Sequence, residues 1–197
     1  MPAVSPDALR AARGLACLSE RDVERLTGIS SQALEASEAG KPGAARTSVR
    51  LGEFYAALGI ELLGWVSLTT GYEYGAGARW RPPWEPGRME AEAAARRNDP
   101  PWLAFAAARA MLEWDQKTAA DKAGLSRRQV EHLEAEGPST RKSRERLRIM
   151  YESRGIEFLG ALANGRVVGV GVRRSSVTDP IFWADILRRD GGRTYPD

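Results

Sequence analysis

Few residues in this chain of 197 could carry out chemistry. The single histidine, His132, and the single cysteine, Cys17, are too few ligands of the right kind for a zinc site. The sequence shows no serine, cysteine or carboxylate constellation with a nearby histidine. The glycine-rich run GAGARW lacks the lysine and the strand–loop–helix setting of a phosphate-binding loop. We therefore expect no catalytic residue, metal, cofactor or small-molecule ligand, and predict that the protein is not an enzyme.

The basic residues are distributed unevenly along the chain. Residues 105–160 carry eleven Lys and Arg against nine Asp and Glu, and five of these positive charges lie within 141–148. Residues 9–64 carry seven residues of each sign. The formal net charge of +3 and the pI of about 9.2 permit a polyanionic partner, and the basic residues of the second half are where it would bind.

The composition is that of an ordinary globular protein. Hydrophobic residues make up 43% and charged residues 28%, which excludes a disordered or a membrane class. Charges interrupt every apolar stretch, and the N-terminal segment lacks the basic start and apolar core of a secretion signal. A lone cysteine fits a reducing compartment. We expect a cytoplasmic, nucleoid-associated protein that does not bind membranes.

An internal repeat organises the chain. Residues 9–64 align with 105–160 at a constant offset of 96 positions without a gap, and 17 of the 56 aligned residues are identical. The identities include the pairs Arg13 and Arg109, Gly28 and Gly124, Ser30 and Ser126, Glu35 and Glu131, and Tyr55 and Tyr151. The chain is therefore two copies of one unit.

Helical periodicity predicts four helices in the second copy. Asp115 is expected to cap the second of these helices and Ser126 the third. Gly124 supplies the positive φ of the tight turn between them. The predicted ranges are 105–114, 116–123, 126–136 and about 140–154, with Leu125, Val130, Leu133, Leu147, Met150 and Tyr151 facing inward.

After each copy the periodicity changes towards two, which favours a short strand. The valines of 165–174 alternate in this way, and 65–74 is interpreted likewise. The Pro- and Gly-rich residues 75–101 are expected to be a linker, whose middle can form a helical turn or two. Asp179 and Pro180 begin an amphipathic segment that is expected to form a short C-terminal helix.

The second copy resembles the Xre-family, lambda-repressor-type helix-turn-helix domain. The likeness lies in the run WDQKTAADKAGLSRRQVEHLE, with small Ala120 where two helices touch and Gly124 at the turn, and in RGIEFLG before a valine-rich strand. It implies a mainly α fold, in which two tandem helix-turn-helix domains of four to five helices are each followed by a short β segment. The expected domains are 1–74 (first, degenerate, with a short β extension), 75–101 (linker), 102–176 (second, with its β extension) and 177–197 (short helix and tail).

The resemblance also implies where DNA binds. In such domains the N-terminal part of the recognition helix enters the major groove, where arginine pairs bidentately with guanine and glutamine with adenine. The implied base-reading residues are Ser126, Arg127, Arg128, Gln129 and His132. The implied phosphate-binding residues are Gln116, Lys117, Thr140, Arg141, Lys142 and Arg144.

The first copy departs from this pattern. Glu24 stands where the pattern has Ala120, Ser37 replaces the inward Leu133, and the expected recognition face has no basic residue. Because a duplex repels carboxylates, we expect the second domain to supply most of the DNA affinity. The first domain is then a weaker reader, a dimerisation module or a partner-binding surface. The candidates for the weaker reader are Ser30, Ser31 and Gln32.

These observations predict a bacterial, sequence-specific transcription regulator that binds double-stranded DNA, a repressor rather than an activator. A fused pair of readers can imitate a dimer within one chain and read an asymmetric site; alternatively, the valine-rich strand pairs with that of a second chain in a homodimer. The competing hypothesis is a protein-binding antiactivator or antitoxin-like regulator that uses the fold as a scaffold. In that case Trp80, Trp84 or the C-terminal helix would contact another regulatory protein.

Overall fold

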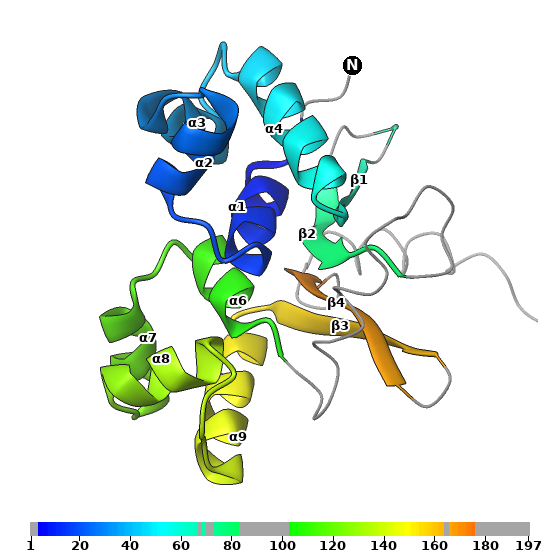
Figure 1. The fold of residues 1–197 in the computed structure, drawn as a ribbon. Helices are drawn as coiled ribbons and strands as arrows, with labels where there is room; N and C mark the ends of the chain where they lie inside the picture. Colours follow the sequence, from blue (N-terminus) through cyan, green and yellow to red (C-terminus); the bar gives the residue numbers. More distant parts are fainter. Residues whose placement is uncertain (1–3, 67, 70–72, 83–102, 164–165, 176–197) are drawn as a thin grey trace, which may run out of the picture.

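The computed structural model describes residues 4–66, 68–69, 73–82, 103–163 and 166–175. In this part of the chain, two runs of four helices are each followed by a pair of antiparallel strands (Figure 1). The first run comprises α1 (Pro6–Leu15), α2 (Glu20–Thr27), α3 (Ser31–Glu38) and α4 (Ala45–Ala57), followed by β1 (Ile60–Val66) and β2 (Glu73–Trp80). The second comprises α6 (Phe105–Met111), α7 (Gln116–Ala123), α8 (Arg127–Glu134) and α9 (Arg141–Glu152), followed by β3 (Ile156–Ala163) and β4 (Arg166–Arg174).

Helices α7 and α8 begin, and α7 ends, at capping and turn residues that the sequence predicts. The Ser126 and Gln129 side chains form a capping box at the start of α8, and Asp115 caps α7. The turns between α2 and α3 and between α7 and α8 each contain a glycine of positive φ, Gly28 at 69° and Gly124 at 63°. The two copies therefore build the same helix–turn–helix segment from the same local signals.

The expectation of a mainly α chain with two tandem domains, each carrying its own short β segment, is wrong. The described residues form eight helices and one four-stranded antiparallel sheet, in the order β1-β2-β4-β3. The second strand of each copy pairs with that of the other copy, so the two hairpins merge into a single sheet. Neither copy forms the four-stranded sheet alone. Each hairpin pairs one of its two strand edges with the hairpin of the other copy, which satisfies the backbone hydrogen bonds of that edge.

The junction between β2 and β4 is unusually close. Gly77 lies opposite Arg173, and Gly171 lies opposite Arg79. A Cβ on Gly77 would stand 2.1 Å from the carbonyl oxygen of Val172, so no other residue fits without a shift of the backbone. The expected linker, 75–101, thus begins inside a strand: the glycines of 75–80 serve close packing rather than flexibility.

The first helices of the two copies also pack directly against each other. A Cβ on Gly14 of α1 would lie 2.5 Å from the Cα of Ala107 in α6, so the two backbones touch. Leu9 and Leu15 of α1 belong to the same cluster of buried side chains as Phe105 and Met111 of α6. The copies therefore share one hydrophobic core as well as one sheet.

The strand contacts between the copies follow a local two-fold symmetry. Gly77 and Arg79 in β2 correspond to Gly171 and Arg173 in β4, and each glycine lies opposite the other copy's arginine. Each arginine also pairs with a glutamate of its own hairpin: Arg79 with Glu61 at 2.6 Å, and Arg173 with its equivalent at 2.8 Å. Reciprocal contacts of this kind define the interface of a two-fold dimer. Here both sides of that interface belong to one chain.

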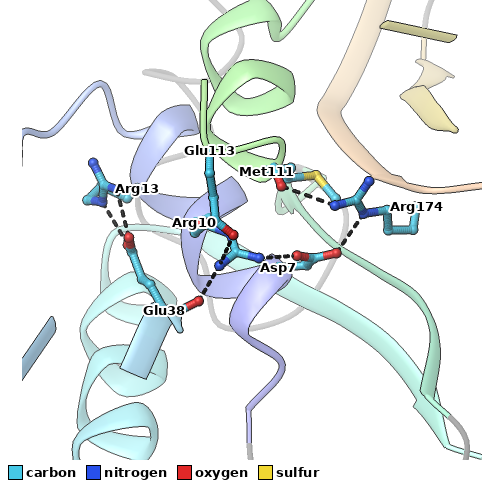
Figure 2. A network of polar contacts seen from close by, with 7 residues as sticks. All are labelled: Asp7, Arg10, Arg13, Glu38, Met111, Glu113 and Arg174. Carbon is cyan, nitrogen blue, oxygen red and sulfur yellow. Dashed lines mark hydrogen bonds and ion pairs between the residues drawn. The ribbon is translucent and has the colours of Figure 1, made fainter. Parts of the chain in front are cut away.

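A polar network fastens the two copies beside this interface (Figure 2). The guanidinium of Arg10 in α1 donates to the backbone carbonyl of Glu38 and pairs with Asp7 and, at 2.9 Å, with Glu113 of the second copy. Arg174 at the end of β4 donates to Asp7 at 2.6 Å and to the carbonyl of Met111 at 3.1 Å. These contacts fix the angle between the copies, because they link α1, the turn after α6 and the sheet.

Several sequence predictions concern residues beyond the described ranges. These are the remainder of the linker from residue 83, including Trp84, and the C-terminal helix and tail over 177–197. Trp80, a candidate for partner contact, lies in β2 and packs partly buried against the shared core. No helix among the described residues is long and apolar enough to cross a membrane.

Candidate nucleic-acid interface

The α8 helix is held against α7 by a small apolar contact. Ala119 and Ala120 of α7 are buried, as are Val130 and Leu133 on the inner face of α8. Trp114, just before α7, stacks on the ring of Tyr151 with 6.3 Å between the centroids. Because the small alanines allow close approach, α8 is braced along its inner face and presents its outer face to solvent.

Arg127 and Arg128 occupy the first turn of α8 and are exposed. Neither side chain forms a hydrogen bond or an ion pair within the described part of the chain. Their guanidinium groups are thus available to a partner in solution. An arginine on the outer face of a protruding helix has the donor geometry needed for bidentate recognition of guanine.

Ser126 and Gln129, two of the expected base-reading residues, form hydrogen bonds within the protein at the start of α8. The Gln129 side-chain oxygen accepts from the Ser126 backbone N–H at 2.8 Å, and its amide nitrogen donates to the Ser143 hydroxyl at 3.3 Å. The Ser126 hydroxyl in turn accepts from the Gln129 N–H at 3.3 Å. Both ends of Gln129 are therefore used to begin α8 and to join it to α9, while one N–H of the exposed side-chain amide is not used in these bonds.

His132 lies four residues after Arg128, one turn further along the helix. It is half-buried, and its backbone carbonyl accepts from the Gly137 N–H at 2.7 Å. The exposed carboxylate of Glu131 lies beside it on the outer face. Glu131 is not among the expected DNA-contacting residues, although the i, i+4 spacing from Arg127 places it on the same face as that arginine.

The candidate phosphate-binding residues divide into exposed cations and residues with structural partners. Lys117, Arg141 and Lys142 are exposed and have no hydrogen bond or ion pair among the described residues. Gln116 donates to the Glu134 carboxylate at 3.0 Å, and Arg144 donates to the Ser139 hydroxyl at 3.4 Å. Lys117, Arg141 and Lys142 are therefore the candidate residues whose charged groups remain available to phosphates.

Thr140 caps α9, since its hydroxyl oxygen accepts from the Ser143 N–H at 3.1 Å. Arg141 and Lys142 follow directly in the first turn. The positive end of the helix dipole and these two cations lie together, an arrangement that attracts anions. In the first copy the equivalent position is Ala44, which provides no side-chain cap.

Two arginines of the basic run in α9 form contacts within the protein. Arg146 donates to the carbonyl of Gly124 at 3.3 Å and so ties α9 to the turn between α7 and α8. Arg148 pairs with Glu145 and Glu152, and its hydrogen bonds lower the pKa of the Glu145 carboxyl. Spacings of three and four residues in RERLRIMYE are the signal that could have revealed these pairs from the sequence.

The equivalent face of the first copy is neutral to acidic. Ser30 caps α3, while the Ser31 hydroxyl donates to Glu24 at 2.7 Å. Glu24 therefore does not enter the helix crossing, where Ala120 lies in the second copy, but remains exposed at its rim. Gln32 is exposed. Of the three candidates for a weaker reader, Gln32 is the one whose side chain is exposed and forms no hydrogen bond among the described residues.

Equivalent ion pairs position α3 and α8 within their units. Arg13 in α1 pairs bidentately with Glu38 at the end of α3, both N–O distances being 2.7 Å. Arg109 in α6 pairs with Glu134 at the end of α8 at 2.6 and 3.0 Å. The glutamate side chains are almost fully buried, 8% and 7% exposed. Paired charges of this geometry restrict the angle at which α3 and α8 leave the core.

Helices α3 and α8 lie on the same side of the molecule. Figure 1 shows α3 and α8 on one side, α1 and α6 between them, and the sheet on the other. Comparison of the chain with models of protein families, with curated proteins and with solved structures finds no match.

Proposed function

We propose that this protein is a sequence-specific double-stranded DNA-binding transcription regulator of bacterial type, a repressor rather than an activator. Its main contact is made by α8 in the major groove. The observation that carries this proposal is the pair Arg127 and Arg128, exposed and without partners among the described residues, at the start of a helix whose inner face is buried. Such a pair reads guanine edges in a groove that accepts one helix.

The surrounding cations support the same orientation. Lys117 at the start of α7 and Arg141 and Lys142 at the start of α9 lie at helix N-termini within the same unit. Contacts of helix N-termini and cations with phosphate fix the register of a helix in the groove without reading sequence. The resemblance to Xre-type regulators noted from the sequence implies the same arrangement.

The proposal is tested by selecting bound duplexes from a random library with the purified chain, followed by affinity measurements. Arg127→Ala and Arg128→Ala are each expected to weaken binding to the selected duplex by about 1–3 kcal/mol, with little change on unselected DNA. Arg141→Ala and Lys142→Ala are expected to weaken binding to all duplexes alike and to reduce the salt dependence by about one phosphate each.

Arg148→Ala is the matched control, because it removes the same charge from a guanidinium already engaged by two glutamates. It is expected to change affinity by less than about 1 kcal/mol. No enriched duplex, or equal losses for Arg127→Ala and Arg148→Ala, would contradict base reading by α8.

A second candidate function, a protein-binding antiactivator or antitoxin-like regulator, is favoured by the first hairpin. Trp65, Val66 and Leu68 are exposed there, Leu68 by 97%. Exposed aromatic and aliphatic side chains close together are common in protein-binding surfaces. This function predicts that duplex selection enriches nothing while Trp65→Ala abolishes regulation in cells, whereas the DNA-reading proposal predicts the reverse.

A further inference from the structure

We infer that a single chain recognises one asymmetric, two-part DNA site, in which α8 reads a strong, guanine-containing half and α3 reads a weaker half. This inference rests on the proposed function and extends it to the kind of site and the number of chains bound. It follows from three observations: the internal two-fold interface, the rigid fastening of the copies, and the unequal chemistry of their reading faces.

The interface that a two-fold dimer would need is already occupied within the chain. The second strands pair reciprocally, with Gly77 opposite Arg173 and Gly171 opposite Arg79. Helices α1 and α6 meet backbone to backbone at Gly14. A second chain therefore cannot use these surfaces, and the unit that has two readers is the monomer.

The free edges of the sheet give little support to a dimer by strand addition. Among the described residues, β1 and β3 form the edges of the sheet, and the register of each is interrupted at the equivalent position, after Leu63 and after Leu159. Bulges at an edge distort the row of backbone groups that an incoming strand would use. The homodimer that the sequence suggested through the valine-rich strand is not needed, because β4 has its partner in β2.

The two-fold relation extends to the reading helices. A cleft beside the interface is lined by Glu35 of α3 and by Ala39, the residue that ends this helix, together with residues 113–115 of the second copy. A second cleft is lined by the equivalent Glu131 of α8 and by Ala135, which ends that helix, together with residues 17–19 of the first copy. The C-terminal turn of each reading helix thus lies next to the other copy. The pairing of two readers about a two-fold axis matches the two-fold relation between half-sites in a duplex.

The polar network makes this arrangement one body. Arg10 reaches Glu113 across the interface, and Arg174 joins Asp7 in α1 to the end of α6 (Figure 2). Because the angle between the readers is set by the fold, both can engage one duplex without the entropy that assembling two free chains would cost.

The two reading faces differ at the positions that meet DNA. At the repeat offset of 96, Ser31 and Gln32 replace Arg127 and Arg128, and Ala45 replaces Arg141. Ser31 is held by Glu24, which leaves Gln32 as the exposed donor and acceptor of the first face. Arginine selects guanine and glutamine selects adenine, so the preferred halves differ in sequence. With fewer cations, the first half also contributes less affinity.

The test uses the full chain and the duplex obtained by selection. The bound complex, sized by light scattering or analytical ultracentrifugation at saturating protein, is expected to contain one chain per duplex, and the selected site is expected to be non-palindromic. Scrambling the strong half should reduce affinity more than scrambling the weak half. A palindrome of two strong halves should bind no better than the site with a scrambled weak half.

Gln32→Ala and Arg128→Ala form the matched pair of variants. Gln32→Ala is expected to reduce affinity about 5-fold or more for the intact site and to have no effect once the weak half is scrambled, while Arg128→Ala shows the same dependence on the strong half. The double substitution S31R/Q32R, which copies the second face onto the first, should improve binding to the strong-half palindrome.

The outcomes separate the inference from the function on which it rests. An enriched palindromic site with two chains per duplex, or insensitivity of the intact site to Gln32→Ala, would overturn the single-chain inference while DNA reading by α8 stands. Failure to enrich any duplex would overturn the proposed function itself. One chain on a non-palindromic site, with the variant dependence above, supports both.

Discussion

Two tyrosine hydroxyls in equivalent positions are buried without a hydrogen-bond partner among the described residues. Tyr55 in α4 and Tyr151 in α9 are fully buried, and each ring lies near the buried glutamate of its unit, Glu38 or Glu134. Burial raises the pKa of both phenols well above the usual value near 10, and the neighbouring carboxylates raise it further. The hydroxyls therefore stay neutral. Because they lose their hydrogen bonds to water on folding and gain none, they lower the free energy of unfolding.

Tyr55→Phe and Tyr151→Phe are accordingly expected to increase the free energy of unfolding by about 1 kcal/mol each, because phenylalanine removes an unsatisfied polar atom and keeps the ring. Above a pH of about 10 the wild-type protein is expected to lose stability as pH rises, since the unfolded tyrosines ionise while the folded ones do not. The double variant should lose less. Urea unfolding at pH 7 and near pH 10.5 checks this; a loss of stability in the variants at pH 7 would show that the hydroxyls have partners after all.

At the level of elements, the contact of α1 with α6 depends on the absence of one side chain. Gly14 lies where any Cβ would stand 2.5 Å from the backbone of Ala107. Gly52, in the middle of α4, is also helical, but a Cβ there would meet only side-chain atoms at 3.4 Å. Substitution by alanine is therefore expected to have opposite effects on stability at the two positions.

Gly14→Ala is expected to destabilise the protein by about 1–3 kcal/mol or more, because the helices must separate to admit the methyl group. Gly52→Ala is expected to be neutral or to stabilise by up to about 1 kcal/mol, since alanine favours the helix. Urea unfolding of both variants measures the difference. Equal effects would contradict the backbone contact between α1 and α6.

For the whole molecule, the shared sheet and core predict that both copies unfold together. The buried cluster runs from Leu9 in α1 to Val172 in β4 without division between the copies. Because each half completes the sheet of the other, neither half is expected to be stable enough alone to be populated as an unfolding intermediate.

Calorimetry is therefore expected to show one transition whose calorimetric and van't Hoff enthalpies agree. Gly77→Ala, which places a Cβ 2.1 Å from a carbonyl oxygen of β4, should lower the transition temperature strongly or split the transition. Gly64→Ala is the strand control, because its Cβ would lie at an ordinary 3.9 Å from Ala76. Two transitions in the unaltered protein would show that the copies are independent domains.

The sequence alone was enough for the features that depend on nearby residues. The repeat, the caps at Asp115 and Ser126, the turn at Gly124 and the outward position of Arg127 and Arg128 follow from contacts within a helix or across one turn. Local capping, turn and periodicity rules describe such contacts well, because the interacting groups are fixed by short spacings along the chain.

Only the tertiary structure decided how the two copies combine. The pairing of β2 with β4 joins residues almost 100 positions apart, and the glycines that permit it resemble a linker when the sequence is read alone. The engagement of Gln129 by Ser143 and of Gln116 by Glu134 depends in the same way on elements that meet only in the folded chain. Such contacts have no short-range pattern, since their partners are chosen by packing and by the need to pair every buried strand edge.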